Sequence, residues 1–137
     1  MKIMIVDDSR QFRESLNDFL THKLHHEVIA EAKSGEEFLA MKSEMQIADI
    51  ILMDIVMNEV DGIKATHKAL DFYPTIKIIA VTMHVDKLFL VQLIETGFRG
   101  CVNKSDIWAN LKEAISTVFA GSIYFPDDIG IMNKQLI

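Results

Sequence analysis

The stretch Ile50-Ile51-Leu52-Met53-Asp54 decides the fold, because four apolar residues in a row end on a single carboxylate. Such an apolar run is typical of a strand covered on both faces, as in a parallel sheet. Residues 2–6 and 76–81 form two more nearly continuous apolar runs, and residues 27–30 and 100–103 are weaker candidates. The chain is therefore predicted to contain five parallel strands.

The segments between these runs have the spacing of amphipathic helices. Ser9 is a candidate helix N-cap, and four apolar residues then fall on one face: Phe12, Leu16, Phe19 and Leu20. Ser34 opens a capping-box pattern. Ser105 is a candidate cap for a stripe made of Ile107, Leu111, Ala114 and Val118. Gly97 and Gly121 lie where helices would end. Strand and helix thus alternate five times, which predicts an α/β, doubly wound (βα)5 fold, a five-stranded parallel sheet with helices on both faces.

Length, charge and cysteine content limit the class of protein. The 137 residues suit one domain, and half of them are apolar. The net charge of −6 makes the chain a poor DNA binder, since DNA affinity comes mostly from Lys and Arg at phosphates. No apolar run reaches the ~18 residues of a membrane span, the start lacks a signal peptide, and the single Cys101 excludes an internal disulfide. We expect a cytoplasmic protein without contact to a membrane.

Side chains that could carry out chemistry follow the predicted strands. Asp7 and Asp8 end the first strand, while the third, fourth and fifth end in Asp54, Thr82 and Lys104. The carboxyl ends of parallel strands meet at one edge of the sheet, where the sites of such folds lie. Three close carboxylates repel one another, and oxygen ligands of this charge suit Mg²⁺. The set predicts a site that stabilises a transferring phosphoryl group, with a carboxylate as the nucleophile.

Five stretches of sequence carry a resemblance to a known family. They are IVDDS at residues 5–9, ILMDIVM at 51–57, DGI at 61–63, VT at 81–82 and GFRGCVNK at 97–104. In this order they resemble the response regulator receiver domain of two-component systems, which has a CheY-like, flavodoxin-like fold. The resemblance extends from residue 2 to about residue 120, nearly the whole chain.

The resemblance implies a role for each residue at the strand ends. Asp54 would be the phosphoacceptor. The ligands of Mg²⁺ would be Asp8, Asp54 and the backbone carbonyl of Val56, with Asp7 bound through water. Lys104 would pair with Asp54 and later with the phosphoryl oxygens, and Thr82 would move to the acyl phosphate and trigger the change of shape. The phosphoryl donor would be a histidine kinase or a small phosphodonor. The domain would not be an enzyme beyond catalysing its own phosphorylation and slow dephosphorylation.

Within the family, one branch is favoured. Thr82-Met83-His84, Lys104-Ser105 and the segment AGSIYFP at residues 120–126 resemble receivers with a LuxR-type helix-turn-helix output domain, often called NarL-like. We therefore expect a receiver domain at residues 1–121 and a linker or tail at residues 122–137. The output domain is missing from this chain, which favours a truncated chain over a stand-alone one. Control of transcription, and any contact with DNA, would require that domain.

Three positions depart from the common family pattern. Asn58 follows Met57 where many receivers have a proline, and Ser105 follows Lys104 where many have a cis proline, so the isomer of that peptide bond stays open. Cys101 stands where a Tyr or Phe usually couples to the threonine. A cysteine is too small to swing in the same way, so the chemistry should survive while the read-out differs. A redox role for Cys101 is disfavoured, since buried cysteines are mostly inert.

The predicted fourth helix has more apolar residues than one core-facing stripe needs. Trp108 and Phe119 share a second stripe on the last helix. We expect Leu90 and Trp108 to lie on a face, made by the fourth helix, fifth strand and fifth helix, that binds a partner or a second copy. The alternative is a short, deeply buried helix. His22, His25 and His26 suit the end of the first helix, whose dipole favours cations, better than a metal site.

Three other functions compete with the phosphorylated switch. A phosphatase of the haloacid dehalogenase type would need an Asp-x-Asp nucleophile on the first strand, whereas Asp7 and Asp8 are adjacent. A flavodoxin-like cofactor binder would need a Gly/Ser/Thr-rich phosphate loop, and residues 7–10 would repel a phosphate without a metal. A phosphorylation-independent interaction module stays an alternative because of Cys101.

Overall fold

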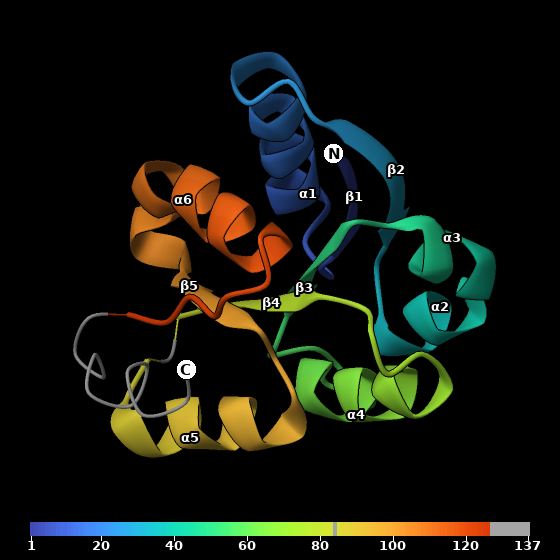
Figure 1. The fold of residues 1–137 in the computed structure, drawn as a ribbon. Coiled ribbons are helices and arrows are strands. Elements are labelled where there is room, and N and C mark those ends of the chain that lie inside the picture. The colour runs from blue at the N-terminus through green and yellow to red at the C-terminus, as the bar shows by residue number, and fades with distance from the viewer. Residues whose placement is uncertain (84, 127–137) are drawn as a thin grey trace.

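The sheet consists of five parallel strands, in a computed structural model that describes residues 1–83 and 85–126 (Figure 1). The strand order is β2-β1-β3-β4-β5. The strands are β1 (Lys2–Val6), β2 (Glu27–Ala32), β3 (Ile50–Asp54), β4 (Ile78–Thr82) and β5 (Gly100–Asn103). All neighbours pair in parallel, which confirms the predicted topology. The predicted end of β2 and the predicted start of β4 each fall two residues before the observed ones.

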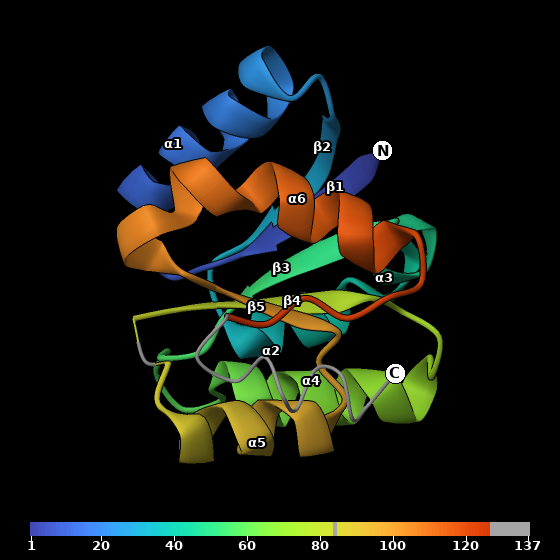
Figure 2. The ribbon, with the colours of Figure 1, turned by 60° about the vertical axis from the view of Figure 1, so that its left-hand side comes forward.

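Helices cover both faces of the sheet, as predicted. Turned by 60°, the molecule shows α1 and α6 on one side of the strands and α2, α4 and α5 on the other (Figure 2). The helices are α1 (Arg10–Asp18), its π-helical continuation η1 (Phe19–Lys23), α2 (Gly35–Ala40), α3 (Lys42–Ile47), α4 (Gly62–Phe72), α5 (Lys87–Thr96), the 3₁₀ turn η2 (Lys104–Asp106) and α6 (Ile107–Phe119). The predicted fourth and fifth helices are therefore α5 and α6, because the second helical segment is divided at Met41 into α2 and α3.

The sheet separates two apolar cores, because side chains of a strand alternate between its faces. Met4 and Met53 belong to the core under α2, α4 and α5, whereas Ile3 and Leu52 belong to the core under α1 and α6. Every residue of β3 is buried, in agreement with its unbroken apolar sequence. The central strand is thus fixed on both faces, and its end, Asp54, has a defined position.

The helix caps agree with the sequence patterns in all but one case. Ser9 Oγ accepts from the amide of Phe12, Ser34 Oγ accepts from that of Glu37, and Gly97 ends α5 with φ 114°. The prediction of Ser105 as the cap of the last helix is wrong. Asp106 occupies that position without a side-chain cap bond, because Asn103 Oδ1 accepts from Ser105 N and begins the η2 turn instead.

The predicted interface residues do not lie on one face. Leu90 is fully buried in the core under α5, whereas Leu88 on the same helix is 83% exposed. The prediction for Leu90 is therefore wrong, because this residue belongs to the stripe that covers the sheet. Trp108 is partly exposed, but it packs on Phe12 and Phe19, with ring centroids 6.2 and 5.0 Å away. Trp108 thus lies on the α1 side of α6, away from α5.

The segment after α6 packs on the edge strand β5. Figure 1 shows this segment running beside β5. The amide of Cys101 donates to Tyr124 O over 2.8 Å, and Gly100 and Tyr124 form a parallel bridge. A Cβ at Gly100 would lie 2.9 Å from Tyr124 O, so only glycine permits this approach. Phe125 is buried in the same core as Cys101. Residues 122–126, which the sequence assigned to a linker, therefore pack on the domain, and residues 127–137 lie outside the described part of the chain.

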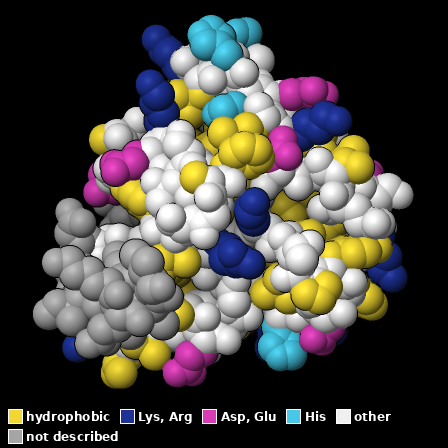
Figure 3. Space-filling model, in the orientation of Figure 1, with side chains coloured by type: hydrophobic (Ala, Val, Ile, Leu, Met, Phe, Trp, Pro, Cys, Tyr) yellow, Lys and Arg dark blue, Asp and Glu magenta, His cyan; other side chains and the backbone are white. Residues whose placement is uncertain are grey.

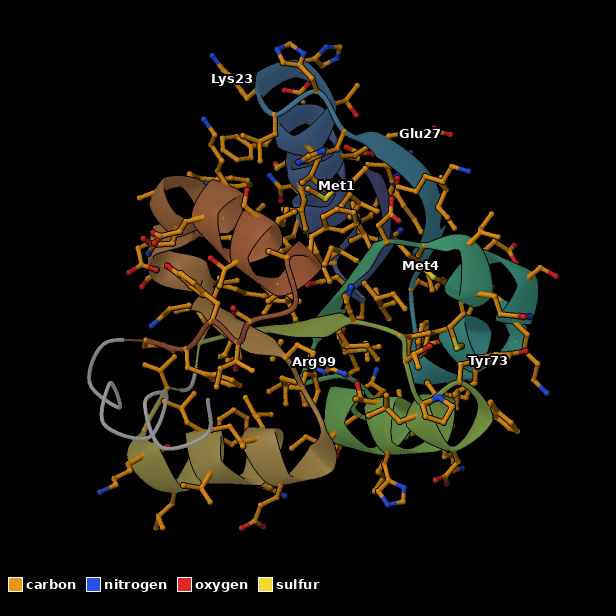
Figure 4. The ribbon with its side chains drawn as sticks, viewed as in Figure 1. Met1, Met4, Lys23, Glu27, Tyr73 and Arg99 are labelled. Carbon is orange, nitrogen blue, oxygen red and sulfur yellow. The ribbon has the colours of Figure 1, made fainter. Side chains whose placement is uncertain are left out.

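The three histidines near residue 25 lie at one end of the molecule. Figure 3 shows histidine side chains gathered there, beyond the stretch where Figure 4 labels Lys23 and Glu27. His22 Nε2 is 3.6 Å from Asp18 Oδ1, and His26 Nδ1 is 3.2 Å from the amino group of Met1. Burial and the nearby amino group lower the pKa of His26. Within residues 1–83 and 85–126, these histidines do not form a group of three ligands.

The helices are too short or too polar to cross a membrane, as far as the described residues extend.

Candidate functional site

Three carboxylates meet at the carboxyl edge of the sheet. β1 pairs directly with β3, with Val6 beside Met53, so the residues that follow each strand are neighbours. Asp7, Asp8 and Asp54 each offer an oxygen within 4.8 Å of the others. The structure therefore brings together the acids that the strand ends predicted.

Asp54 ionises less readily than an ordinary aspartate. Its side chain is only 5% exposed, and Asp7 beside it is also buried. Burial and the charge of Asp7 raise the pKa of Asp54 to about 6, although the ammonium of Lys104 lowers it in part. At neutral pH Asp54 is mostly an anion, and a second cation in the site would stabilise that form.

Lys104 joins two of the carboxylates. It follows β5, and its Nζ lies 3.0 Å from Asp7 Oδ2 and 3.3 Å from Asp54 Oδ1. The same Nζ is 4.6 Å from the ring centre of Phe12, a cation–π contact. Burial opposes the charge of Lys104, but Asp54 and Asp7 outweigh that effect, so the pKa of Lys104 is raised. Lys104 therefore remains an ammonium at physiological pH.

A small pocket opens beside these residues. Its volume is about 260 Å³, and its lining consists of Asp8, Asp54, Val56, Thr82, Met83 and Lys104. Thr82 is buried at the end of β4, opposite Asn103 of β5. Val56 is mostly exposed and is part of the same lining. Five of the predicted site positions thus line one pocket, and the buried Asp7 lies beside them.

The residues present fit a hard divalent cation. Asp7 Oδ2 is buried and accepts no hydrogen bond of good geometry from the described residues, although Lys104 is close. The other oxygen, Oδ1, accepts from the amide of Ser9 over 2.8 Å. A donor set made only of carboxylate and carbonyl oxygens is the one that Mg²⁺ prefers. The residues that could hold such an ion are Asp7, Asp8, Asp54 and the carbonyl of Val56.

The loop after Asp54 folds back tightly against β3. The amide of Gly62 donates to Ile55 O over 2.9 Å, and a Cβ at Gly62 would collide with the backbone oxygen of Asp54. Glycine is therefore required where this loop approaches the strand that carries the central carboxylate. The Lys104–Ser105 bond, whose isomer the sequence left open, is trans, as are the other peptide bonds of the described chain.

Cys101 lies deep in the core, not on the site. Burial raises the pKa of its thiol to about 12, so a thiolate is not available for redox chemistry at neutral pH. Cys101, Val85 and Phe125 line a second cavity, of about 490 Å³, beside β5. The small side chain of Cys101 thus lies in the same core as the aromatic ring of Phe125, from the segment after α6.

The sequence did not indicate the roles of two residues, Arg13 beside the site and Phe125 in the core beside Cys101. The guanidinium of Arg13 donates to the backbone carbonyl of Asp7 over 2.7 Å, and it pairs with Glu31 on β2. Its position on the first turn of α1 is readable in the sequence, but its partner is distant along the chain. Phe125 was assigned to the tail because no periodicity extends through residues 122–126.

Comparison with known proteins identifies the sequence pattern. The family model described as "Response regulator receiver domain" matches residues 3–116. The response regulator GacA of Pseudomonas syringae pv. syringae (strain B728a) is 34% identical over 129 residues, which cover 94% of this chain and 60% of that protein. This chain therefore spans about 60% of the length of that relative.

Solved structures share the fold. The crystal structure of a two-component response regulator of the LuxR family, from Aurantimonas sp. SI85-9A1, has a TM-score of 0.87 and 30% identity, covering 99% of this chain and 98% of that one. The CheX-CheY-BeF₃-Mg complex from Borrelia burgdorferi has a TM-score of 0.81 at 23% identity, covering 87% and 89%. The second likeness concerns the fold alone.

Proposed function

This chain belongs to the response regulator receiver domain family, and from that premise we propose that it is a phosphorylation-driven switch with Asp54 as its acceptor. The observation that carries the proposal is the position of Lys104, which contacts both Asp7 and Asp54 at the mouth of a pocket lined by a third acid. The arrangement places one positive charge, and oxygen ligands for a second, around a buried carboxylate. Developing negative charge at this position is therefore stabilised on several sides.

The chemistry is a transfer of one phosphoryl group. A carboxylate oxygen of Asp54 attacks phosphorus and forms a P–O bond, while the bond from phosphorus to the donor breaks and the leaving group keeps its electron pair. When bound by Asp7, Asp8, Asp54 and the carbonyl of Val56, Mg²⁺ supplies positive charge to the phosphoryl oxygens. Lys104 holds the carboxylate before transfer and the phosphoryl oxygens after it. Thr82, buried at the end of β4, turns its hydroxyl to the product and reports its formation.

The proposed donor is a phosphohistidine of a histidine kinase, or a small phosphodonor. Transfer from the imidazole nitrogen gives an acyl phosphate on Asp54 and neutral histidine after uptake of a proton. Hydrolysis of the acyl phosphate then restores the carboxylate. The domain catalyses these steps on itself and turns over no other substrate.

The proposed output is control of transcription in the cytoplasm through a DNA-binding domain of the LuxR type. The LuxR-family neighbour and the length of the GacA relative support this assignment. We propose that residues 1–126 form the receiver, which places its boundary a few residues later than the sequence suggested. A homodimer stays a prediction, with Leu88 in place of Leu90 as the exposed position on α5.

The second candidate is a receiver that binds partners without phosphate. Cys101 favours it, because a buried thiol cannot swing as an aromatic ring does. The first candidate is favoured by the intact set of acids together with Thr82 and Lys104. A module that only binds partners has no need for a buried carboxylate whose ionisation is costly.

Beryllofluoride, a phosphomimetic, separates these candidates. In the presence of Mg²⁺ it should shift the amide resonances of Thr82 and Lys104 in the wild-type protein. The Asp54→Asn variant, tested as a matched control, should show no such shifts. If the wild-type amides do not respond at any concentration of both reagents, the phosphorylated switch is wrong and the interaction module is favoured.

A further inference from the structure

Arg13 connects the acidic turn to two other elements. Its Nη1 donates to the backbone carbonyl of Asp7 over 2.7 Å, and its Nε donates to Glu31 Oε1 over 3.2 Å. Glu31 Oε2 accepts in turn from Asn17 Nδ2 over 2.8 Å. One hydrogen-bond network thus joins α1 and β2 to the peptide group between Asp7 and Asp8.

That peptide group sets the direction of two acidic side chains. Its carbonyl belongs to Asp7 and its nitrogen to Asp8, so holding this peptide restricts ψ of Asp7 and φ of Asp8, on which the backbone positions of both acids depend. Asp7 is also held at its amide, which donates to Ala32 O over 3.0 Å, and at Oδ1, which accepts from Ser9. The carbonyl, the amide and Oδ1 of Asp7 therefore all have hydrogen-bond partners outside the pocket. Oδ2 is the atom that faces Lys104 in the site.

The Arg13–Glu31 pair is shielded, unlike the ion pair beside it on α1. The side chains of Arg13 and Glu31 are 15% and 32% exposed, whereas those of Arg10 and Glu14 are 85% and 65% exposed. Exposed pairs within one helix contribute little to stability, but a shielded pair with charge-assisted hydrogen bonds holds its geometry. Arg10 and Glu14 therefore provide a matched control on the same helix.

We propose that Arg13, held by Glu31, is a positioning residue that presents Asp7 and Asp8 to the divalent cation. The inference rests on the proposed metal site and adds a residue to it. Arg13 does not touch the reacting atoms; it fixes the peptide from which two ligands project. Residues that orient metal ligands typically change metal affinity 10–100-fold when they are replaced.

The test is Mg²⁺ affinity, measured by isothermal titration at pH 7.5 without a phosphodonor. Arg13→Met should weaken binding about tenfold, and Glu31→Gln should weaken it less but in the same direction. The double variant should bind no more weakly than Arg13→Met, because both changes break one network. Arg10→Met and Glu14→Gln should stay within twofold of wild type. Thermal unfolding of each variant shows whether a change in affinity follows from a loss of fold.

A second readout needs no metal. Hydrogen exchange at the Ser9 amide, which donates to Asp7 Oδ1, should be faster in Arg13→Met than in Arg10→Met. Arg13→Lys keeps the charge but cannot make both hydrogen bonds of the guanidinium. This variant should give intermediate values of Mg²⁺ affinity and of Ser9 exchange. It replaces Arg13→Met in both experiments if Arg13→Met does not fold.

The outcomes separate this inference from the proposed function. A wild-type protein that binds no Mg²⁺ contradicts the metal site, and the Ser9 exchange still reports on Arg13. Wild-type binding that Arg13→Met and Arg13→Lys leave within twofold, with unchanged Ser9 exchange, overturns the role of Arg13 alone.

Discussion

At the level of single residues, the proposed switch depends on Asp54, a buried carboxylate whose ionisation is costly. Asp54 lies between the acids that follow β1 and the ammonium of Lys104. Its pKa is raised because burial and the charge of Asp7 outweigh the opposing effect of Lys104. Folding stability is linked to this pKa. Because the folded pKa of Asp54 is raised from 3.8 to about 6, the penalty is lost well below the ordinary pKa, grows between the two pKa values and is fully present above about pH 6.

The Asp54→Asn variant should therefore be more stable than wild type in a metal chelator at pH 7.5. A shift of this size corresponds to roughly 2–3 kcal/mol in the free energy of unfolding. The difference should shrink towards zero as the pH falls to about 3, below the ordinary pKa of an aspartate, where Asp54 is protonated in both states. Urea unfolding at a series of pH values measures it. If the gain in unfolding free energy of Asp54→Asn did not depend on pH, the pKa of Asp54 would not be raised in the folded protein.

The site residues were predictable because each follows a strand. Topology alone brings the ends of β1, β3, β4 and β5 to one edge, so Asp7, Asp54, Thr82 and Lys104 could be named from their positions in the sequence. Arg13 could not be, because its carbonyl and carboxylate partners are set by the packing of α1 on β2. Burial, and hence the pKa of Asp54, also depends on tertiary packing that periodicity does not reveal.

At the scale of the element, α5 shows how far a hydrophobic pattern can be read. Apolar residues cover more than one face of this helix, and the sequence could not decide which of them face the sheet. Leu90 and Leu93 do, whereas Leu88 points to solvent. Asp86 caps the helix, because its side chain accepts from Phe89 N, and the position of this cap determines which residues of α5 face the sheet. The division of the second helical segment at Met41 was likewise not visible, since no Gly or Pro marks it.

Two neighbouring leucines of α5 should respond very differently to truncation. Leu90→Ala should lower the free energy of unfolding by about 2–5 kcal/mol, because it leaves a cavity in the core. Leu88→Ala should change it by less than about 0.5 kcal/mol, because the side chain is mostly exposed. Chemical denaturation of the metal-free proteins gives both values. Equal losses would mean that the orientation of α5 is wrong.

At the level of the whole molecule, the segment that follows α6 packs back on the sheet. Residues 122–126 run beside β5 and bury Phe125 next to Cys101. β5 leads directly to Lys104, so residues 122–126 pack on the strand that precedes a site residue. The sequence placed a linker here, because a short irregular segment has no period and its partner strand is distant along the chain.

Phe125 should therefore contribute to stability as a core residue does. Phe125→Ala is expected to cost about 3–5 kcal/mol of unfolding free energy. Phe119→Ala is the control: this ring is partly exposed and lies 5.4 Å from Lys77 Nζ, so its loss should cost about 1 kcal/mol or less. Thermal or urea unfolding of both variants decides. A Phe125 variant as stable as the control would show that residues 122–126 are not part of the domain.

Intact-mass measurement shows whether Asp54 accepts a phosphoryl group. The protein is incubated with Mg²⁺ and acetyl phosphate, beside an Asp54→Ala variant and a sample without Mg²⁺. The complete reaction should add the mass of one phosphoryl group, and neither control should gain mass. Wild-type protein that stays at its original mass, or an Asp54→Ala variant that gains the same mass, would contradict the assignment of Asp54 as the acceptor.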